Sequence, residues 1–123
     1  MDQINILIIG NCGVGKTYVM QNLIKSFKCD NDMKVDLLHY KTNGYLNITG
    51  RYQGGVFQGS DKLSMSVMTS LDKYLNDVKG VNIFEGDRFT NSNFIAKAKP
   101  YIIKINGKGQ EGRKLRGSVQ STR

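Results

Sequence analysis

The feature that most constrains this chain is an apolar run followed at once by a glycine-rich turn and a helical pattern. Residues Ile4 to Ile9 are apolar except for Asn5, which is typical of a strand buried on both faces of a parallel sheet. The turn reads GNCGVGKT from Gly10 to Thr17. Apolar residues then recur at helical spacing, which predicts a helix over 16–28 with one buried stripe.

The turn has glycines at 10 and 15 followed by Lys16 and Thr17, the spacing of the Walker A signature. Such glycines let the backbone form a nest of N–H groups at the positive end of the next helix, which suits a phosphate. We expect Lys16 to reach the β and γ oxygens of ATP and Thr17 to ligate Mg²⁺. The predicted nucleotide-binding residues are Gly10, Asn11, Cys12, Gly13, Val14, Gly15, Lys16 and Thr17.

The rest of the chain alternates strand and helix patterns around one long loop. Strands are predicted over 35–41, 45–52, 81–84 and 101–105, with an Asn-Gly turn at 43–44. Helices are predicted over 69–80, where Thr69 and Asp72 resemble a capping pair, and over 92–97. We therefore expect an α/β fold, a three-layer sandwich with a mainly parallel central sheet, small or incomplete at its C-terminal end.

Two acids follow the predicted strand 81–84. Enzymes with a Walker A loop need a carboxylate near Mg²⁺, usually at the end of a neighbouring strand. Glu85 and Asp87 are the candidates, one as metal ligand and one as base, and the sequence does not divide the roles. Arg88 beside them could clamp an acceptor phosphate bidentately, and a solvated surface position is the alternative.

The formal net charge of +8 is concentrated at the C-terminal end, where Lys97 to Arg123 hold eight basic residues against Glu111. We divide the chain into a nucleotide-binding core, 1–105, and a basic, glycine-rich tail, 106–123, expected to be mobile without a ligand. Arg113 and Arg116 could close over the phosphates as a lid. A nucleic-acid surface or a solubilising tail is the alternative.

Other signals set limits on function. No apolar run is long enough to span a membrane, and no signal peptide is indicated, so a cytoplasmic protein is expected. Cys12 and Cys29 show no disulfide or zinc spacing and are expected to be reduced thiols. The single histidine, His39, favours a packing role over a ligand role.

With the Walker A loop, EGDRF at 85–89 and RKLRGS at 113–118, the chain resembles P-loop kinases of the nucleoside and nucleotide kinase type, and DRF resembles thymidylate-kinase motifs. The stretch GGVFQGSDKLSMSV at 54–67 is also similar to bacteriophage-encoded P-loop kinases, some of which phosphorylate a hydroxymethylated pyrimidine in DNA. That resemblance implies acceptor-site roles for Asp61, Ser60, Ser64 and Ser66. Such kinases normally continue with a lid helix and further core elements, whereas this sequence stops at Arg123.

The resulting expectation is an ATP- and Mg²⁺-dependent kinase that moves the γ-phosphoryl group to a nucleoside, a nucleotide or a modified DNA base. It would act in the cytoplasm, or in the host cytoplasm if phage-encoded. The alternative is a P-loop ATPase, or a nucleotide-dependent module that binds nucleic acid or protein, without an acceptor. A truncated domain that folds but lacks chemistry is a third possibility. No Asn-Lys-x-Asp element is present to select GTP.

Overall fold

The computed structural model describes residues 3–10, 15–53, 56–57, 67–86, 89–106 and 118–122. Within these ranges the strands are β1 (Gln3–Ile9), β2 (Asn31–Val35), β3 (Leu38–Thr42), β4 (Leu46–Thr49), β5 (Tyr52–Gln53), β6 (Val56–Phe57), β7 (Gly80–Glu85), β8 (Tyr101–Asn106) and β9 (Ser118–Thr122). The helices are α1 (Lys16–Ser26), the short 3-10 helix η2 (Val67–Ser70), α2 (Leu71–Asp77) and α3 (Ser92–Ala98).

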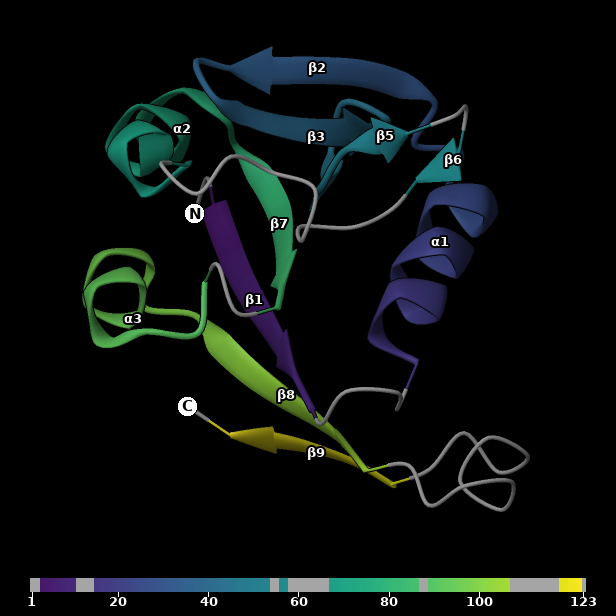
Figure 1. Ribbon diagram of the computed structural model, residues 1–123, viewed down its shortest axis with the longest axis vertical. Helices are drawn as coiled ribbons and strands as arrows, with labels where there is room; N and C mark the ends of the chain where they lie inside the picture. The colour runs from purple at the N-terminus through teal and green to yellow at the C-terminus, as the bar shows by residue number, and fades with distance from the viewer. Residues whose placement is uncertain are drawn as a thin grey trace.

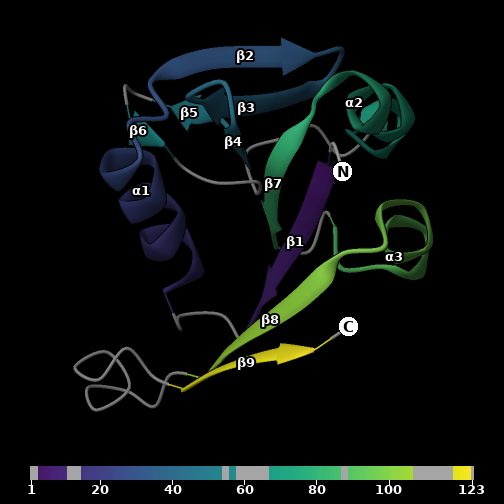
Figure 2. The ribbon, with the colours of Figure 1, turned by 180° about the vertical axis from the view of Figure 1, so that it is seen from behind.

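The fold is α/β, built on a mixed sheet whose described strands lie in the order β2-β3-β4-β7-β1-β8-β9. Strands β4, β7, β1 and β8 run parallel in the centre. The antiparallel strands β2, β3 and β9 extend the sheet at its two edges. Figure 1 shows α1 on one side of the sheet and α2 and α3 on the other, and Figure 2 shows the same arrangement from behind.

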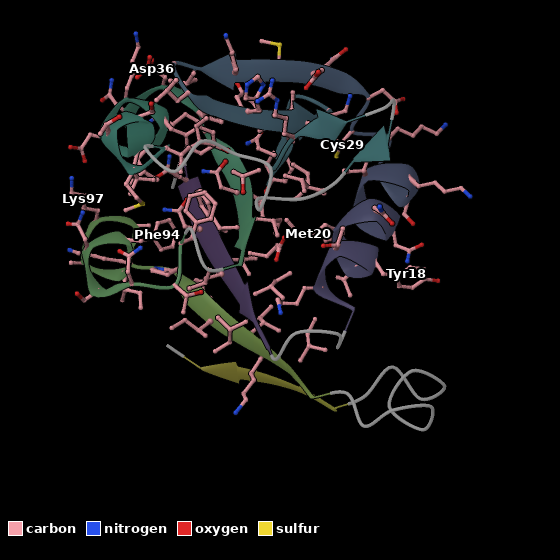
Figure 3. The ribbon with its side chains drawn as sticks, in the orientation of Figure 1. Tyr18, Met20, Cys29, Asp36, Phe94 and Lys97 are labelled. Atoms are coloured by element: carbon pink, nitrogen blue, oxygen red, sulfur yellow. The ribbon has the colours of Figure 1, made fainter. Side chains whose placement is uncertain are left out.

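The sheet buries a different apolar cluster on each face because side chains alternate along every strand. On the α1 face, Met20 and Ile24 of the helix pack with Ile8, Ile48 and Ile83 of three neighbouring strands. The opposite face carries a cluster rich in aromatic rings, in which Phe84 contacts Tyr74, Phe89 and Phe94 edge to face. In Figure 3 the labelled Met20 and Phe94 lie on opposite sides of the sheet.

A row of asparagines crosses the amino-terminal half of the parallel strands. Asn5, Asn82 and Asn47 are register partners on β1, β7 and β4, and all three are buried. Asn82 Nδ2 donates to Asn5 Oδ1 at 2.9 Å, Asn47 Nδ2 donates to Asn82 Oδ1 at 2.9 Å, and the Tyr74 hydroxyl donates to the same oxygen at 3.1 Å. We call these four residues the asparagine ladder. A slip of one residue would break every bond in it, so the ladder favours one register of the three strands.

The structure confirms several of the predicted elements and corrects others. The predicted strand 35–41 is instead a hairpin, in which β2 and β3 meet at a turn where Asp36 has a positive φ of 56°. Helix α2 is not capped by Thr69: Ser70 is its N-cap residue and makes no capping bond, because its hydroxyl donates to Asp36 of that turn at 2.7 Å. The long loop predicted from residue 53 contains the short β5–β6 pairing.

Part of the tail that was predicted to be mobile forms a strand. Residues 118–122 form β9, which pairs antiparallel with β8 in a register of five residue pairs. Sequence periodicity missed this strand because it is short and polar, and strands at the edge of a sheet need bury little apolar surface. Among the described helices, none is long and apolar enough to cross a membrane.

Candidate functional site

The structure describes the junction between β1 and α1 at its two ends, Gly10 and Gly15. Gly15 precedes the helix with φ 95° and ψ 25°, in the left-handed region that favours glycine. Its carbonyl accepts from the Val19 amide at 3.0 Å, which starts the helical hydrogen-bond pattern. The Lys16 ammonium donates to the Gly10 carbonyl at 2.7 Å. The side chain of Lys16 therefore reaches back from the start of α1 to the end of β1.

Glu85 is the predicted acid that the structure places beside this junction. It ends β7 and is the register partner of Ile8 on β1, two residues before Gly10. Ile83 belongs to the apolar cluster under α1, so the alternation along β7 directs Glu85 to the α1 face as well. Its side chain is only 3 % exposed. A buried carboxylate and the start of the glycine-flanked helix thus share one face and one edge of the sheet.

The topology concentrates functional groups at this edge. From β1 the chain passes through α1 to the β2-β3-β4 side of the sheet, whereas from β7 it crosses through α3 to β8 on the opposite side of β1. The carboxyl end of β1 is therefore a point where the connections diverge, and open α/β sheets form their ligand-binding crevice at such a point. Gly10, Lys16, Thr17 and Glu85 all lie at this point.

The loop after β7 is anchored by the carbonyl of Gly86. This oxygen accepts from the Phe89 amide at 3.2 Å and from the Thr90 hydroxyl at 2.8 Å. Helix α3 then begins with Asn91 as its N-cap, whose side chain accepts from the Phe94 amide at 2.8 Å. The chain is thereby fixed on both sides of the predicted Asp87 and Arg88.

The remaining predicted site residues lie outside the described residues. In the phosphate loop these are Asn11, Cys12, Gly13 and Val14; after β7 they are Asp87 and Arg88; in the tail they are Arg113 and Arg116; and in the acceptor segment they are Ser60, Asp61, Ser64 and Ser66. Their predicted roles stay predictions. Of the full set, the structure describes Gly10, Gly15, Lys16, Thr17 and Glu85. Lys16 bonds to Gly10, and Glu85 lies on the strand next to β1.

Sequence reasoning missed a second polar group on the same face. His39 on β3 is a register partner of Lys34 on β2, and it is half-buried rather than enclosed in the core. Burial lowers the pKa of the His39 imidazole, and the positive charges of Arg51 and Lys34 lower it further, while Asp32 opposes them. The sequence held no signal for this arrangement, because the turn that brings Lys34 opposite His39 was not predicted.

Cys29 is buried and carries a free thiol, and Cys12 lies outside the described residues. Burial raises the pKa of this thiol, which disfavours the thiolate and makes it a poor nucleophile. Within the described ranges, no three or more His, Cys, Asp or Glu side chains group together as metal ligands.

Comparison with known proteins adds no family assignment. No protein-family model matches the chain, and neither the curated proteins nor the solved structures contain a significant match.

Proposed function

We propose that this protein is an ATP-binding P-loop phosphotransferase that uses the carboxyl edge of β1 and β7 as its active site. One observation carries the proposal: the Walker A sequence lies between a buried parallel strand and a helix, with Gly15 left-handed and Lys16 bonded to Gly10. If the motif matched only by chance, it would have no reason to lie between a buried strand and a helix. The buried carboxylate of Glu85 on the neighbouring strand is the second supporting feature.

The residues at this edge fit the chemistry of a magnesium nucleotide. Thr17 and Glu85 offer hydroxyl and carboxylate oxygens, the donors that Mg²⁺ prefers, and the nucleotide phosphates supply further oxygens. Bound with ATP, Mg²⁺ would offset the phosphate charge during transfer. Because an ammonium has three N–H donors, Lys16 could donate to phosphate oxygens while its bond to the Gly10 carbonyl holds the ends of the loop.

In the proposed reaction an acceptor oxygen forms a bond to the γ-phosphorus while the bond from phosphorus to the β,γ-bridging oxygen breaks. ADP leaves, and the proton of a hydroxyl acceptor passes to a carboxylate. Glu85 is the described residue placed to take that proton, with Asp87 as the other candidate. Lys16 holds the phosphates in line, which is the larger part of catalysis in phosphoryl transfer.

The proposal is tested by incubating the protein with γ-labelled ATP and Mg²⁺. Nucleosides, nucleoside monophosphates, and DNA with or without hydroxymethylated pyrimidines serve as acceptors in parallel. We expect label on one acceptor class, lost in Lys16→Ala and kept in Lys25→Ala, which removes an exposed lysine from the last turn of the same helix. ATP affinity unchanged by Lys16→Ala would refute nucleotide binding at this loop. Label released only as free phosphate would identify an ATPase instead.

A further inference from the structure

Strand β2 forms one edge of the sheet, and among the described strands it pairs with β3 alone. Its first four residues are exposed. Figures 1 and 2 both show β2 at the top of the view, with no labelled element beyond it. An exposed strand edge is a template on which another strand can pair, because its outward N–H and C=O groups are available for hydrogen bonds.

The backbone groups that point outward from β2 are those of Asp32 and Lys34. In an antiparallel pair, facing residues alternate between hydrogen-bonded and non-hydrogen-bonded pairs. The Gly50 amide donates to the His39 carbonyl at 2.9 Å, so the backbone groups of His39 point to β4 and not to β2. Lys34 faces His39 and is therefore in a non-hydrogen-bonded pair, with its N–H and C=O directed away from β3. Asp32, two residues earlier, has the same orientation.

The side chains of β2 carry opposite charges on one face and an exposed methionine on the other. Val35 packs with the aromatic cluster, so alternation directs Met33 to that same face. Asp32 and Lys34 accordingly project to the α1 face. Met33 is 48 % exposed. Within the described ranges, neither Asp32 nor Lys34 makes an ion pair inside the chain.

From this arrangement we propose that two copies of the chain associate by antiparallel pairing of their β2 strands. A two-fold axis at Met33 places Asp32 opposite Lys34 of the second copy, and Lys34 opposite Asp32 of the second copy. The outward N–H and C=O groups of these residues then bond across the axis. Two pairs of opposite charges face each other on the α1 side, and the two Met33 side chains meet on the other side.

Charge complementarity favours this register over its neighbours. Outward backbone groups must face outward backbone groups, so the alternatives are shifts by two residues. A shift in one direction places the two Asp32 carboxylates opposite each other on the axis, and a shift in the other direction does the same for the two Lys34 ammonium groups. Like charges directly opposite each other are destabilising. The pairing uses no residue of the proposed active site, so it does not rest on the proposed function.

The dimer is expected to be weak. A strand of five residues buries less than the roughly 800 Å² per partner of a standard interface. The net charge of +8 on each copy also opposes association. We expect a dissociation constant of about 100 µM at about 0.15 M salt, where exposed charges more than about 8 Å apart are largely screened.

Charge exchange tests the dimer and its register together. Asp32→Lys alone and Lys34→Asp alone each place two pairs of like charges in the interface, so sedimentation equilibrium should show self-association weakened at least about tenfold. Mixing the two single variants should restore association to the wild-type level, because each chain then supplies the charges that the other lacks. The double variant Asp32→Lys/Lys34→Asp should also associate like wild type. Lys104→Asp makes the same charge change at an exposed position on β8 and should have no effect.

Disulfide trapping tests the register by a second route. Met33→Cys places two thiols on the axis, where the Cα atoms of a non-hydrogen-bonded pair lie about 4.5 Å apart, within reach of a disulfide. Asn31→Cys is the control, because it is exposed on the same face of β2 but its two Cα atoms would be about 14 Å apart. Under mild oxidation, Met33→Cys should give a covalent dimer and Asn31→Cys should not.

Three results would overturn the proposal: a protein that stays monomeric at every concentration, single charge variants that do not recover on mixing, or equal trapping of the two cysteine variants. Recovery on mixing also shows that both single variants are folded. Binding of ATP and transfer of label are measured separately, so loss of the proposed function would leave the dimer unaffected, and the reverse also holds.

Discussion

The two ends of the parallel strands use polar side chains for opposite purposes. In the amino-terminal half, Asn5, Asn47, Asn82 and Tyr74 satisfy one another and are closed to solvent. At the carboxyl edge, the ammonium of Lys16 donates to the Gly10 carbonyl, Glu85 is buried on the neighbouring strand, and Lys34 of the hairpin lies opposite His39. The hydrogen bonds in the amino-terminal half fix the register of the strands. That register places Glu85 level with Ile8 at the carboxyl edge.

Among the tests of this comparison, removing the centre of the asparagine ladder should change the free energy of unfolding most. Asn82→Ala deletes an amide that bonds Asn5, Asn47 and Tyr74 in a buried site, and we expect a loss of about 4 kcal/mol in the free energy of unfolding. Urea unfolding measures it. Asn76→Ala, at an exposed position on α2, should change stability by less than about 0.5 kcal/mol. Equal small effects of the two substitutions would show that the ladder does not fix the register.

A second test concerns the start of β7, at the same end of the sheet. Gly80 has φ 100°, and a Cβ there would overlap the Tyr45 carbonyl, whereas Gly44 has φ 95° with open space around it. Gly80→Ala should therefore lower the free energy of unfolding by about 3 kcal/mol, and Gly44→Ala by about 1 kcal/mol from backbone strain alone. Comparable losses in urea unfolding would contradict the close approach.

At the other end, neutralising the buried acid should affect chemistry and leave folding intact. Glu85→Gln keeps the shape of the side chain but cannot accept the proton, so we expect phosphoryl transfer to fall about 100-fold. The free energy of unfolding should stay within about 1 kcal/mol of wild type. Burying a charged carboxylate costs desolvation free energy, and a neutral amide of the same shape avoids that cost. Initial rates with γ-labelled ATP, compared with Asp77→Asn at an exposed position, measure it. Full activity would leave Asp87 as the remaining candidate base.

The smallest effect is a pH dependence of stability from His39. Its pKa is lowered in the folded protein, so the unfolded chain binds more protons near the ordinary value of about 6.5. The stability from this group is present above that value and is lost as pH falls through the folded pKa. Urea midpoints at pH 7.5, 6.5 and 5.5 should fall more steeply for wild type than for His39→Gln. Parallel curves would show that His39 does not couple to folding.

The sequence predicted the elements whose pattern is local. The strand at 4–9 and helix α1 follow from apolar spacing and from the glycine-rich turn that begins at Gly10, helix α3 was predicted over 92–97, and the structure confirms all three. The turn at 36–37 was missed because residues 35–40 are mostly apolar and contain no glycine or proline. β9 was missed because pairing with β8, and not its own composition, makes it a strand.

The same distinction between local patterns and strand pairing applies to the candidate site. Gly15 and Lys16 are recognisable because one motif contains them, and Glu85 because it follows a buried strand. The alignment of Lys34, His39, Gly50 and Glu85 could not be predicted, because it depends on how β2, β3, β4 and β7 line up across the sheet. The sequence therefore predicted a packing role for His39, and the strand register places His39 opposite Lys34.

The bond from Lys16 to the Gly10 carbonyl has a consequence for the thermodynamics of ligand capture. It ties the end of β1 to the start of α1, so the span of residues 11–14 has its two ends held together before any nucleotide arrives. The loss of conformational entropy from closing that loop then belongs to folding and not to association. For the proposed nucleotide binding, a tie of this kind should make the entropy of association less unfavourable than for a loop whose ends must first be brought together.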